Sequence, residues 1–418
     1  MTFDATNSPT HLAENIYVLR EEFPALARTY NGRSIAYFDG PGGTQVPNSV
    51  IRAIEASYIE RNANFDGAFS TSQDNGQAVK TVRETVAQFL GAEGPNTISF
   101  GANMTSLNYA LSRGISRQLS PGDEVIITAL DHEANRGPWM GLKEFGVSII
   151  DVAMCDDGSL DYNDLEKKVG SKTKLVAVGL ASNAIGTVND IEKIISIAKA
   201  NGALVVGDAV HYAAHFPLDV SKLNIDFLLC SAYKFYGPHI GILYSRPGLL
   251  ETIETDRLRP QKQTAPYRIE TGTLNYPALS GVAAAIEFIG ELGFGDTLYE
   301  CTHHAMNLMH DYEMDLATQY HEGLCTLPGI EIRGPDISAS RTPTVSFNHQ
   351  TIRAEAIAEH LADLAIQVWH GHFYAEQVLR HYKLTELGGL LRVGMSVYNT
   401  AGEVARLLNA LEDITRRR

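Results

Sequence analysis

Residues 204–244 read LVVGDAVHYAAHFPLDVSKLNIDFLLCSAYKFYGPHIGILY, and this stretch decides the fold. It opens with an apolar run that ends at Asp208, the pattern of a buried strand whose last residue emerges at the carboxyl edge of a sheet. A second apolar run brings Ser231 and Lys234 to a similar edge. A glycine-rich turn then enters a third apolar run. The pattern predicts neighbouring strand ends that present one acid and one lysine to the same crevice.

An organic carbonyl cofactor explains this pair of side chains. A lysine amine can form a Schiff base with a carbonyl group, and a carboxylate can keep a pyridine nitrogen protonated so that the ring withdraws electrons. Pyridoxal phosphate needs both groups, so Lys234 and Asp208 predict this cofactor. The alternative for each residue taken alone is an ordinary surface position.

Two other kinds of site fit parts of the stretch. Ser231-Ala-Tyr-Lys234 matches the SxxK of serine acyl-enzymes, but that chemistry also uses SDN and KTG elements, which this sequence lacks. Asp208, His211 and His215 could line one helical face as metal ligands. Phe216-Pro217 follows at once and would end such a helix early, so we expect no metal site.

The stretch resembles the pyridoxal phosphate segment of class V aminotransferases, in particular the cysteine desulfurase and selenocysteine lyase branch. The likeness rests on Asp208-Ala-Val-His211, on Ser231-Ala-Tyr-Lys234 and on the following Gly-Pro. It implies fold type I of the pyridoxal phosphate enzymes, aspartate aminotransferase-like, an α/β fold with a mostly parallel seven-stranded type of sheet and a smaller α/β domain. It also implies that His211 and Ser231 contact the cofactor. Tyr233 stands where the family has a histidine, and its hydroxyl could still donate to the phosphate.

A strand-to-helix junction at residues 101–105 is a second candidate contact for the cofactor. The N–H groups at a helix start can hold a phosphate, which makes Asn103, Met104 and Thr105 candidates. The family usually has threonines here, so we expect backbone donors to do more of the binding. The resemblance also assigns His132, after Asp131, to a position over the cofactor ring.

Further matches extend the resemblance from about residue 37 to residue 400. A strand and glycine-rich turn near residue 40 is expected to border the substrate pocket. The amide of Asn183 is expected to contact the phenolic oxygen of the cofactor and the substrate carboxylate. Arg392 is expected to hold that carboxylate, because its planar guanidinium matches a carboxylate at two points. Gly272-Thr273 is expected to reach the phosphate of a neighbouring subunit, which implies a homodimer with shared active sites.

The loop Gly371-His-Phe-Tyr-Ala375 departs from the family. Sulfur-transferring desulfurases carry a nucleophilic cysteine in this loop and an arginine shortly before it, where this chain has Tyr374 and Trp369. Cys230 lies in an apolar run and is interpreted as a packed core residue. Persulfide formation needs a thiolate, so we do not expect ordinary desulfurase activity. His372, Tyr374 and Trp369 are expected to form a lid that contacts the substrate.

Composition limits the other possibilities. The chain has 418 residues, 44% hydrophobic and 20% charged, as in an ordinary soluble globular protein. A net charge of -15 without a dense basic run argues against nucleic acid or an anionic membrane as the main partner. The four cysteines form no CxxC pair, which disfavours a disulfide framework or a zinc site. No signal segment or long apolar run occurs, and a cytoplasmic protein is expected.

Three parts of the chain are expected: a helical arm over residues 1–30 that packs with the small domain, a large cofactor-binding domain over 31–276 and a small α/β domain over 277–418. The predicted activity is Cα deprotonation of a small α-amino acid by Lys234, followed by elimination of the Cβ substituent. An aminotransferase or an epimerase is the alternative on the same residues. A cofactor-free binding protein is the alternative from another class.

Overall fold

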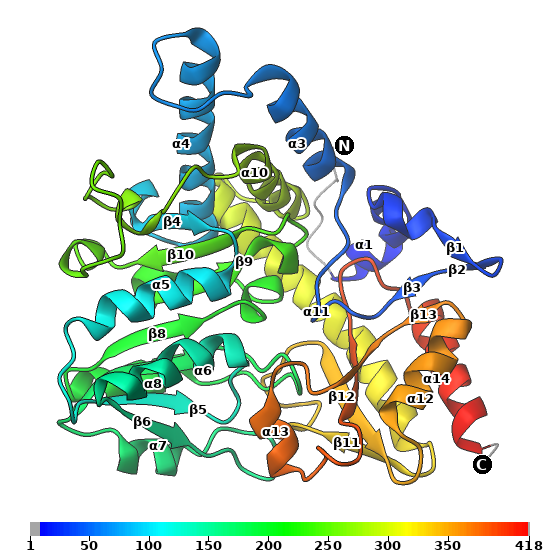
Figure 1. Cartoon of the computed structure of the whole chain (residues 1–418). Coiled ribbons are helices and arrows are strands. Elements are labelled where there is room, and N and C mark those ends of the chain that lie inside the picture. The colour runs from blue at the N-terminus through cyan, green and yellow to red at the C-terminus, as the bar shows by residue number, and fades with distance from the viewer. Residues whose placement is uncertain (1–8, 417–418) are drawn as a thin grey trace.

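The computed structural model describes residues 9–416, and a seven-stranded sheet lies at its centre (Figure 1). The strand order is β4-β10-β9-β8-β7-β5-β6. Only β10 runs antiparallel to its neighbours, β4 and β9, while the other described pairs are parallel. The predicted mostly parallel seven-stranded sheet is therefore confirmed. The strands are β4 (Ile98–Gly101), β5 (Glu124–Thr128), β6 (Ser148–Val152), β7 (Thr173–Gly179), β8 (Leu204–Asp208), β9 (Phe227–Ser231) and β10 (Gly241–Ser245).

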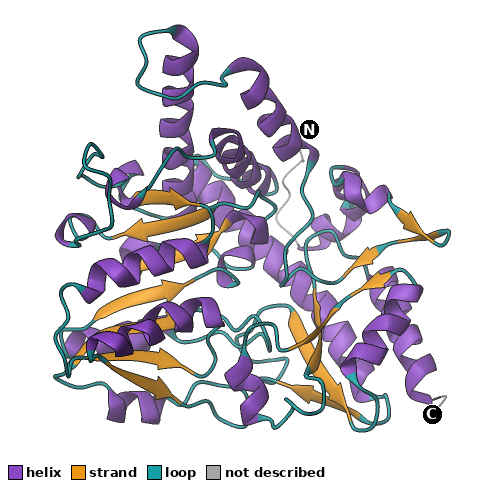
Figure 2. Ribbon diagram, viewed as in Figure 1, coloured by secondary structure: helices purple, strands orange, loops and turns teal. Residues whose placement is uncertain are grey.

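Both faces of this sheet are buried, because alternate side chains of its strands enter two different apolar clusters. Val205 and Leu228 join the larger cluster, whereas Val206 and Leu229 join the smaller one. Helices cover the two faces (Figure 2). Near the sheet these helices are α4 (Ser70–Leu90), α5 (Met104–Ser116), α6 (Glu133–Met140), α7 (Tyr162–Lys168), α8 (Ile191–Ala200) and α9 (Val220–Leu223).

The C-terminal part is built on a four-stranded antiparallel sheet of order β11-β12-β15-β14. Helix α14 packs against the 28-residue α11, which also contacts α4 and so connects the two parts of the molecule (Figure 1). Helix α12 packs in turn against α14. These elements are α11 (Leu298–Cys325), β11 (Ile330–Arg333), β12 (Thr344–His349), α12 (Ala354–Asp363), β14 (Trp369–Gly371), α13 (Glu376–His381), β15 (Leu390–Gly394) and α14 (Ala401–Arg416).

The start of the chain contacts this C-terminal part. Arg20 forms an ion pair of 2.9 Å with Glu403, and β3 pairs in parallel with β13. The expected first residues of the arm, 1–8, lie outside the described residues. The remaining elements are α1 (Pro9–Glu14), α2 (Ile16–Glu21), β1 (Thr29–Tyr30), β2 (Arg33–Ser34), β3 (Ala36–Tyr37), α3 (Asn48–Glu60), α10 (Tyr276–Glu291) and β13 (Ile366–Gln367).

Helix α10 begins at the expected domain boundary and packs against α3 and α4. It also packs against α11, so it lies between the helices of the large sheet and the long helix of the C-terminal part. Within residues 9–416, none of the helices combines the length and the apolar character that crossing a membrane requires.

Candidate active site

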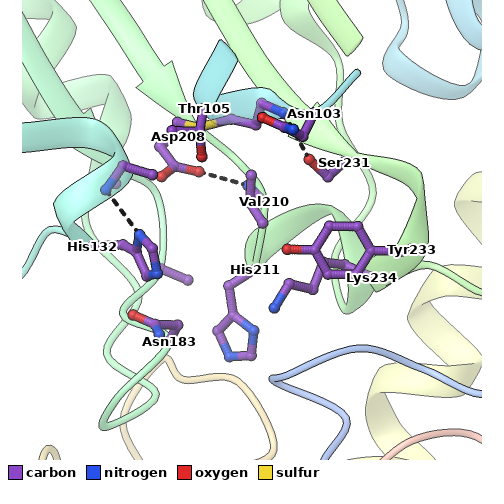
Figure 3. Close-up of a pocket in the computed structure, with 14 residues that line it drawn as sticks. Asn103, Thr105, His132, Asn183, Asp208, Val210, His211, Ser231, Tyr233 and Lys234 are labelled. Carbon is purple, nitrogen blue, oxygen red and sulfur yellow. Dashed lines mark hydrogen bonds between the residues drawn. The ribbon is translucent and has the colours of Figure 1, made fainter. Parts of the chain in front are cut away.

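A cavity lies at the carboxyl ends of β7, β8 and β9, beside the start of α5, with roughly 560 Å³ of empty space when its open side is included (Figure 3). A larger hollow of roughly 1340 Å³ adjoins it and shares His132, Asn183 and Lys234 with it. We call the first space the inner cavity and the second the vestibule. The inner cavity gathers the predicted cofactor residues Asn103, Met104, Thr105, His132, Asn183, Asp208, His211, Ser231, Tyr233 and Lys234, and the vestibule adds the predicted substrate residues His372, Tyr374 and Arg392.

Lys234 ends a short 3-10 helix, Ala232–Lys234, that directly follows β9. Its amine is buried and donates a hydrogen bond to the carbonyl oxygen of Pro41. Burial, and next the positive charge of Arg392, lower the pKa of this amine to about 7. A lysine with this pKa is present in substantial amount as the neutral amine at neutral pH, which is the form that attacks a carbonyl or accepts a proton.

Asp208 ends β8 on the other side of the inner cavity. The N–H of Val210 donates to its Oδ1 at 2.9 Å, and burial raises the pKa of the carboxyl to about 7 (Figure 3). Asp131 lies behind it and accepts hydrogen bonds from the backbone N–H groups of Thr128, at 2.9 Å, and Gly179. The negative charge of Asp131 adds to the rise of the Asp208 pKa. A cationic ring nitrogen in this cavity would favour the ionised form of Asp208.

The start of α5 closes the inner cavity at the phosphate end that the sequence predicts. Asn103 caps this helix: the N–H of Ser106 donates to its Oδ1 at 2.8 Å. The N–H of Met104 donates to Ser231 Oγ at 3.1 Å (Figure 3). Glycine at 241 permits this approach, because a Cβ there would lie 2.2 Å from the carbonyl carbon of Asn103. Thr105 lines both the inner cavity and the vestibule.

His132 caps α6 and is held in one protonation state. The N–H of Ala134 donates to its Nδ1 at 2.9 Å, so that nitrogen carries no proton. Burial, followed by the charges of Lys234 and Arg392, lowers the pKa of His132 to about 4. At neutral pH the ring is therefore neutral and carries its single proton on Nε2.

The loop that departs from the family covers this histidine. The ring of Tyr374 stacks on that of His132, with centroids 5.4 Å apart and planes 30° apart. Phe373 and Tyr374 both have left-handed backbone angles, with φ of 53° and 56°, which costs energy in residues with side chains. Hydrogen bonds hold the loop in this shape: Asn183 Nδ2 donates to the oxygen of Phe373 at 2.9 Å, and the N–H of Glu133 to that of Tyr374 at 2.7 Å.

Arg392, on β15, is buried beside the same loop. Its Nη1 donates to the oxygen of Asn183 at 2.9 Å, and its guanidinium carbon lies 4.3 Å from the ring centre of Phe373. Burial lowers its pKa to about 9. Among the described residues, no hydrogen-bond partner meets the Nε of Arg392 or the Oδ1 of Asn183. The site thus contains a buried cation with donor capacity left for a carboxylate.

His211 and Thr273 occupy different surroundings. His211 lines the inner cavity, and its Nε2 lies 3.0 Å from the hydroxyl oxygens of both Thr342 and Thr344, which come from the C-terminal part. Thr273 is exposed and lines neither cavity within this chain. Its expected role toward a neighbouring subunit stays a prediction.

Sequence reasoning missed Asp39. The carboxyl is largely buried near Lys234 and Arg392, burial raises its pKa, and its Oδ1 meets no hydrogen-bond partner in the part of the chain that the structure describes. The turn after it lines the vestibule through Pro41 and Gly42, as Tyr109 of α5 does. The signal that could have indicated Asp39 was an acid directly after a short apolar strand, the same signal that singled out Asp208.

No thiol lines either space. Cys230 is buried in β9, and burial raises the pKa of its thiol. Among residues 9–416, Cys155, Cys301 and Cys325 also lie outside both linings. No cluster of three or more His, Cys, Asp or Glu side chains that could bind a metal occurs in the same range.

These residues fit pyridoxal phosphate. An amine with a lowered pKa and a buried carboxylate line one cavity beside a helix start, and Asn183 has an amide oxygen without a partner there. Lys234 would hold the carbonyl end and Asp208 the ring nitrogen. The residues around the start of α5 would hold the phosphate.

Comparisons with known proteins agree with this geometry. The sequence profile described as "Aminotransferase class-V" matches residues 36–407. A cysteine desulfurase of Pectobacterium atrosepticum is 32% identical over 414 residues, which cover 95% of this chain and 97% of that protein. The crystal structure of the cysteine desulfurase CsdA from Escherichia coli superimposes with a TM-score of 0.84 at 26% identity, covering 96% of this chain and 98% of that one. An apo cysteine desulfurase from Thermococcus onnurineus gives a TM-score of 0.84 at 27% identity, and the match covers 100% of both chains.

Proposed function

Since the chain belongs to the aminotransferase class-V family, we propose that it is a lyase that removes a leaving group from Cβ of an α-amino acid. Family membership and the matching folds confirm the predicted enzyme class and the predicted cofactor, pyridoxal 5'-phosphate. The substrate and the outcome of the reaction are the proposal.

One observation carries the proposal: Lys234 and Asp208 line a single cavity, and no described cysteine lines that cavity or the vestibule. Bound pyridoxal phosphate supplies an electron-withdrawing ring that makes the Cα proton of an attached amino acid acidic. A protein thiolate would be needed to take sulfur from a substrate as a persulfide. Without such a thiolate, the bond between Cβ and its substituent has to break with the electron pair staying on the substituent.

The side chains of this chain divide the remaining work. Arg392 binds the substrate carboxylate through the guanidinium N–H groups that are not bonded to Asn183. Lys234, neutral in part at pH 7, removes the Cα proton. The neutral ring of His132, fixed by its bond from Ala134, offers one N–H donor toward the reacting groups. The loop Gly371–Ala375 lines the vestibule beside this centre, and the ring of Tyr374 stacks on that of His132.

The test uses the purified enzyme loaded with cofactor and a panel of cysteine, cystine, alanine and serine derivatives. We expect keto acid to appear without any added acceptor, and Lys234→Ala to abolish both turnover and the visible absorption of the lysine-bound cofactor. Cys230→Ala is the matched control and should retain kcat within about threefold, because its side chain only packs in the core.

Other outcomes identify the alternatives. A strict need for a second keto acid would make the protein an aminotransferase, and inversion at Cα without loss of the amino group would make it an epimerase. A thousandfold loss of activity in a folded Cys230→Ala protein would show that a thiol takes part after all. A colourless protein that cannot be reconstituted would be a binding protein.

A further inference from the structure

The vestibule is lined by aromatic side chains to an extent that the proposed reaction does not require. Its lining includes the rings of Tyr109, Tyr233, Trp369, Phe373 and Tyr374. Trp369, Tyr374 and Tyr109 remain 52%, 64% and 44% exposed. Large apolar rings left uncovered around one hollow mark a binding surface rather than a packed core.

These rings stand beside the groups that would hold the substrate. A Cβ placed on Gly42 would lie 2.7 Å from the indole Nε1 of Trp369, and the neighbouring Pro41 accepts the hydrogen bond of the lysine amine. The ring centre of Tyr233 lies 5.0 Å from the Nζ of Lys234. A substituent on Cβ of an amino acid held between Arg392 and Lys234 would therefore extend among aromatic rings.

The size and charge of the vestibule further limit which substituents a substrate can carry on Cβ. The vestibule adjoins the inner cavity and opens to solvent, so a substituent larger than the side chain of serine or cysteine can extend from Cβ into it. Glu133 is the one acid among the described lining residues, and it lies 3.3 Å from Arg136, which also pairs with Asp151. Arg392 and Lys234 add positive charge. The lining therefore offers no free anion for a substrate with a cationic side chain, and it favours a neutral, flat group.

The chemistry of the leaving group also favours an aromatic substituent. With no thiolate to attack sulfur, Cβ–S cleavage depends on how well the departing group carries the electron pair, and a thiol of lower pKa leaves faster. An aromatic ring on sulfur stabilises the departing thiolate by delocalisation. The rings of the vestibule can stack on such a group, and one aromatic pair contributes about 0.5–1.5 kcal/mol beyond its buried area.

We propose that the substrates are S-aryl cysteine conjugates, or cysteine derivatives with a similar flat aromatic group on sulfur, an inference that rests on the proposed elimination. The Cα–H bond breaks and its proton goes to Lys234. The Cβ–S bond breaks with its electron pair on sulfur, and the thiolate takes up a proton. Water hydrolyses the remaining three-carbon fragment, so that substrate and water give an arenethiol, pyruvate and ammonium.

The experiment compares S-phenyl-L-cysteine with S-methyl-L-cysteine in the cofactor-loaded enzyme. Pyruvate release is measured for the wild type, Trp369→Ala and the control Phe145→Ala, whose ring is 60% exposed and lines neither space. We expect kcat/KM to favour the phenyl compound at least tenfold. Trp369→Ala should lower that ratio at least fivefold, and Phe145→Ala should leave it unchanged.

The outcomes separate this inference from the function on which it rests. Equal kcat/KM for both compounds, or an equal loss for both in Trp369→Ala, overturns the aromatic preference while elimination stands. No pyruvate from either compound, or from any other Cβ-substituted amino acid, overturns the proposed function itself. Sedimentation of Trp369→Ala is measured in parallel: a loss of subunit association would show that the exposed rings serve a second copy of the chain, and would also overturn the inference.

Discussion

Lys234 lies among groups that act in opposite directions on its amine. Burial and the nearby Arg392 favour the neutral amine, whereas Asp208 and Asp39 favour the charged form. The sequence predicted this lysine and Asp208, because both follow apolar strands that end at one sheet edge. It could not predict Asp39 as a partner, because contacts across almost two hundred residues of chain follow from the folded arrangement and not from local pattern.

The lowered pKa of Lys234 predicts how cofactor capture depends on pH. A lysine amine must be neutral to attack the carbonyl of pyridoxal phosphate, and the neutral fraction grows as pH rises through about 7. We expect the rate at which the apoenzyme gains visible absorption to rise about tenfold per pH unit below that value and to level off above it. The control is Nα-acetyl-lysine, which keeps a free side-chain amine, mixed with the same cofactor. Its rate of reaction should continue to rise toward pH 10, near the ordinary lysine pKa of about 10.4. A protein rate that still climbs between pH 8 and 9.5 would contradict this assignment.

At the scale of elements, a buried ion pair joins helix α4 to the segment that precedes α10. Glu270 accepts from Nη1 and Nη2 of Arg83, each at 2.7 Å, and from the N–H of Phe100 at 2.7 Å. The segment holds Thr273 three residues later. An ion pair between residues far apart in the sequence has no periodic signature, so the sequence did not indicate it. The left-handed turn at Phe373 and Tyr374 was also not predicted. Glycine or asparagine is the usual sequence signal for such backbone angles, and neither residue stands at these two positions.

Removing one partner of this pair should destabilise the fold strongly. Glu270→Ala leaves the guanidinium of Arg83 buried without its carboxylate, which costs about 3–5 kcal/mol of unfolding free energy. Lys262→Ala is the matched control, because its ion pair with Asp66, at 3.0 Å, is exposed and is worth less than about 1 kcal/mol. Urea unfolding of both variants with cofactor bound measures the difference. A loss in Glu270→Ala no larger than that of the control would show that the pair contributes little to stability.

At the scale of the whole molecule, α3 and the start of α4 project beyond the large sheet (Figure 1). Tyr58, Ile59 and Phe69 on this projection are exposed. Apolar side chains grouped on a projection suit an interface, which supports the homodimer that the resemblance implies. The resemblance to class V aminotransferases made the large sheet predictable from the sequence. The subunit arrangement is not predictable in that way, because nothing in one chain's periodicity distinguishes a partner from solvent.

Charge on the projection should therefore weaken subunit association. We expect the wild type to sediment with twice the mass of one chain. The double variant Ile59→Glu, Phe69→Glu should sediment closer to the mass of one chain, because each subunit would have to bury two carboxylates in an apolar contact. Leu387→Glu, exposed on the C-terminal part, is the control and should leave the mass unchanged. A doubly substituted protein that keeps the wild-type mass would place the interface elsewhere.

The missing thiol around Lys234 has a consequence for the conditions under which this protein can work. Peroxide, alkylating drugs and heavy-metal ions inactivate enzymes that have an exposed cysteine in the active site, because they react with its thiol. Cys230 is buried inside β9 and is shielded from all three. The reaction proposed for this chain should continue under oxidative stress that halts catalysts built on sulfur.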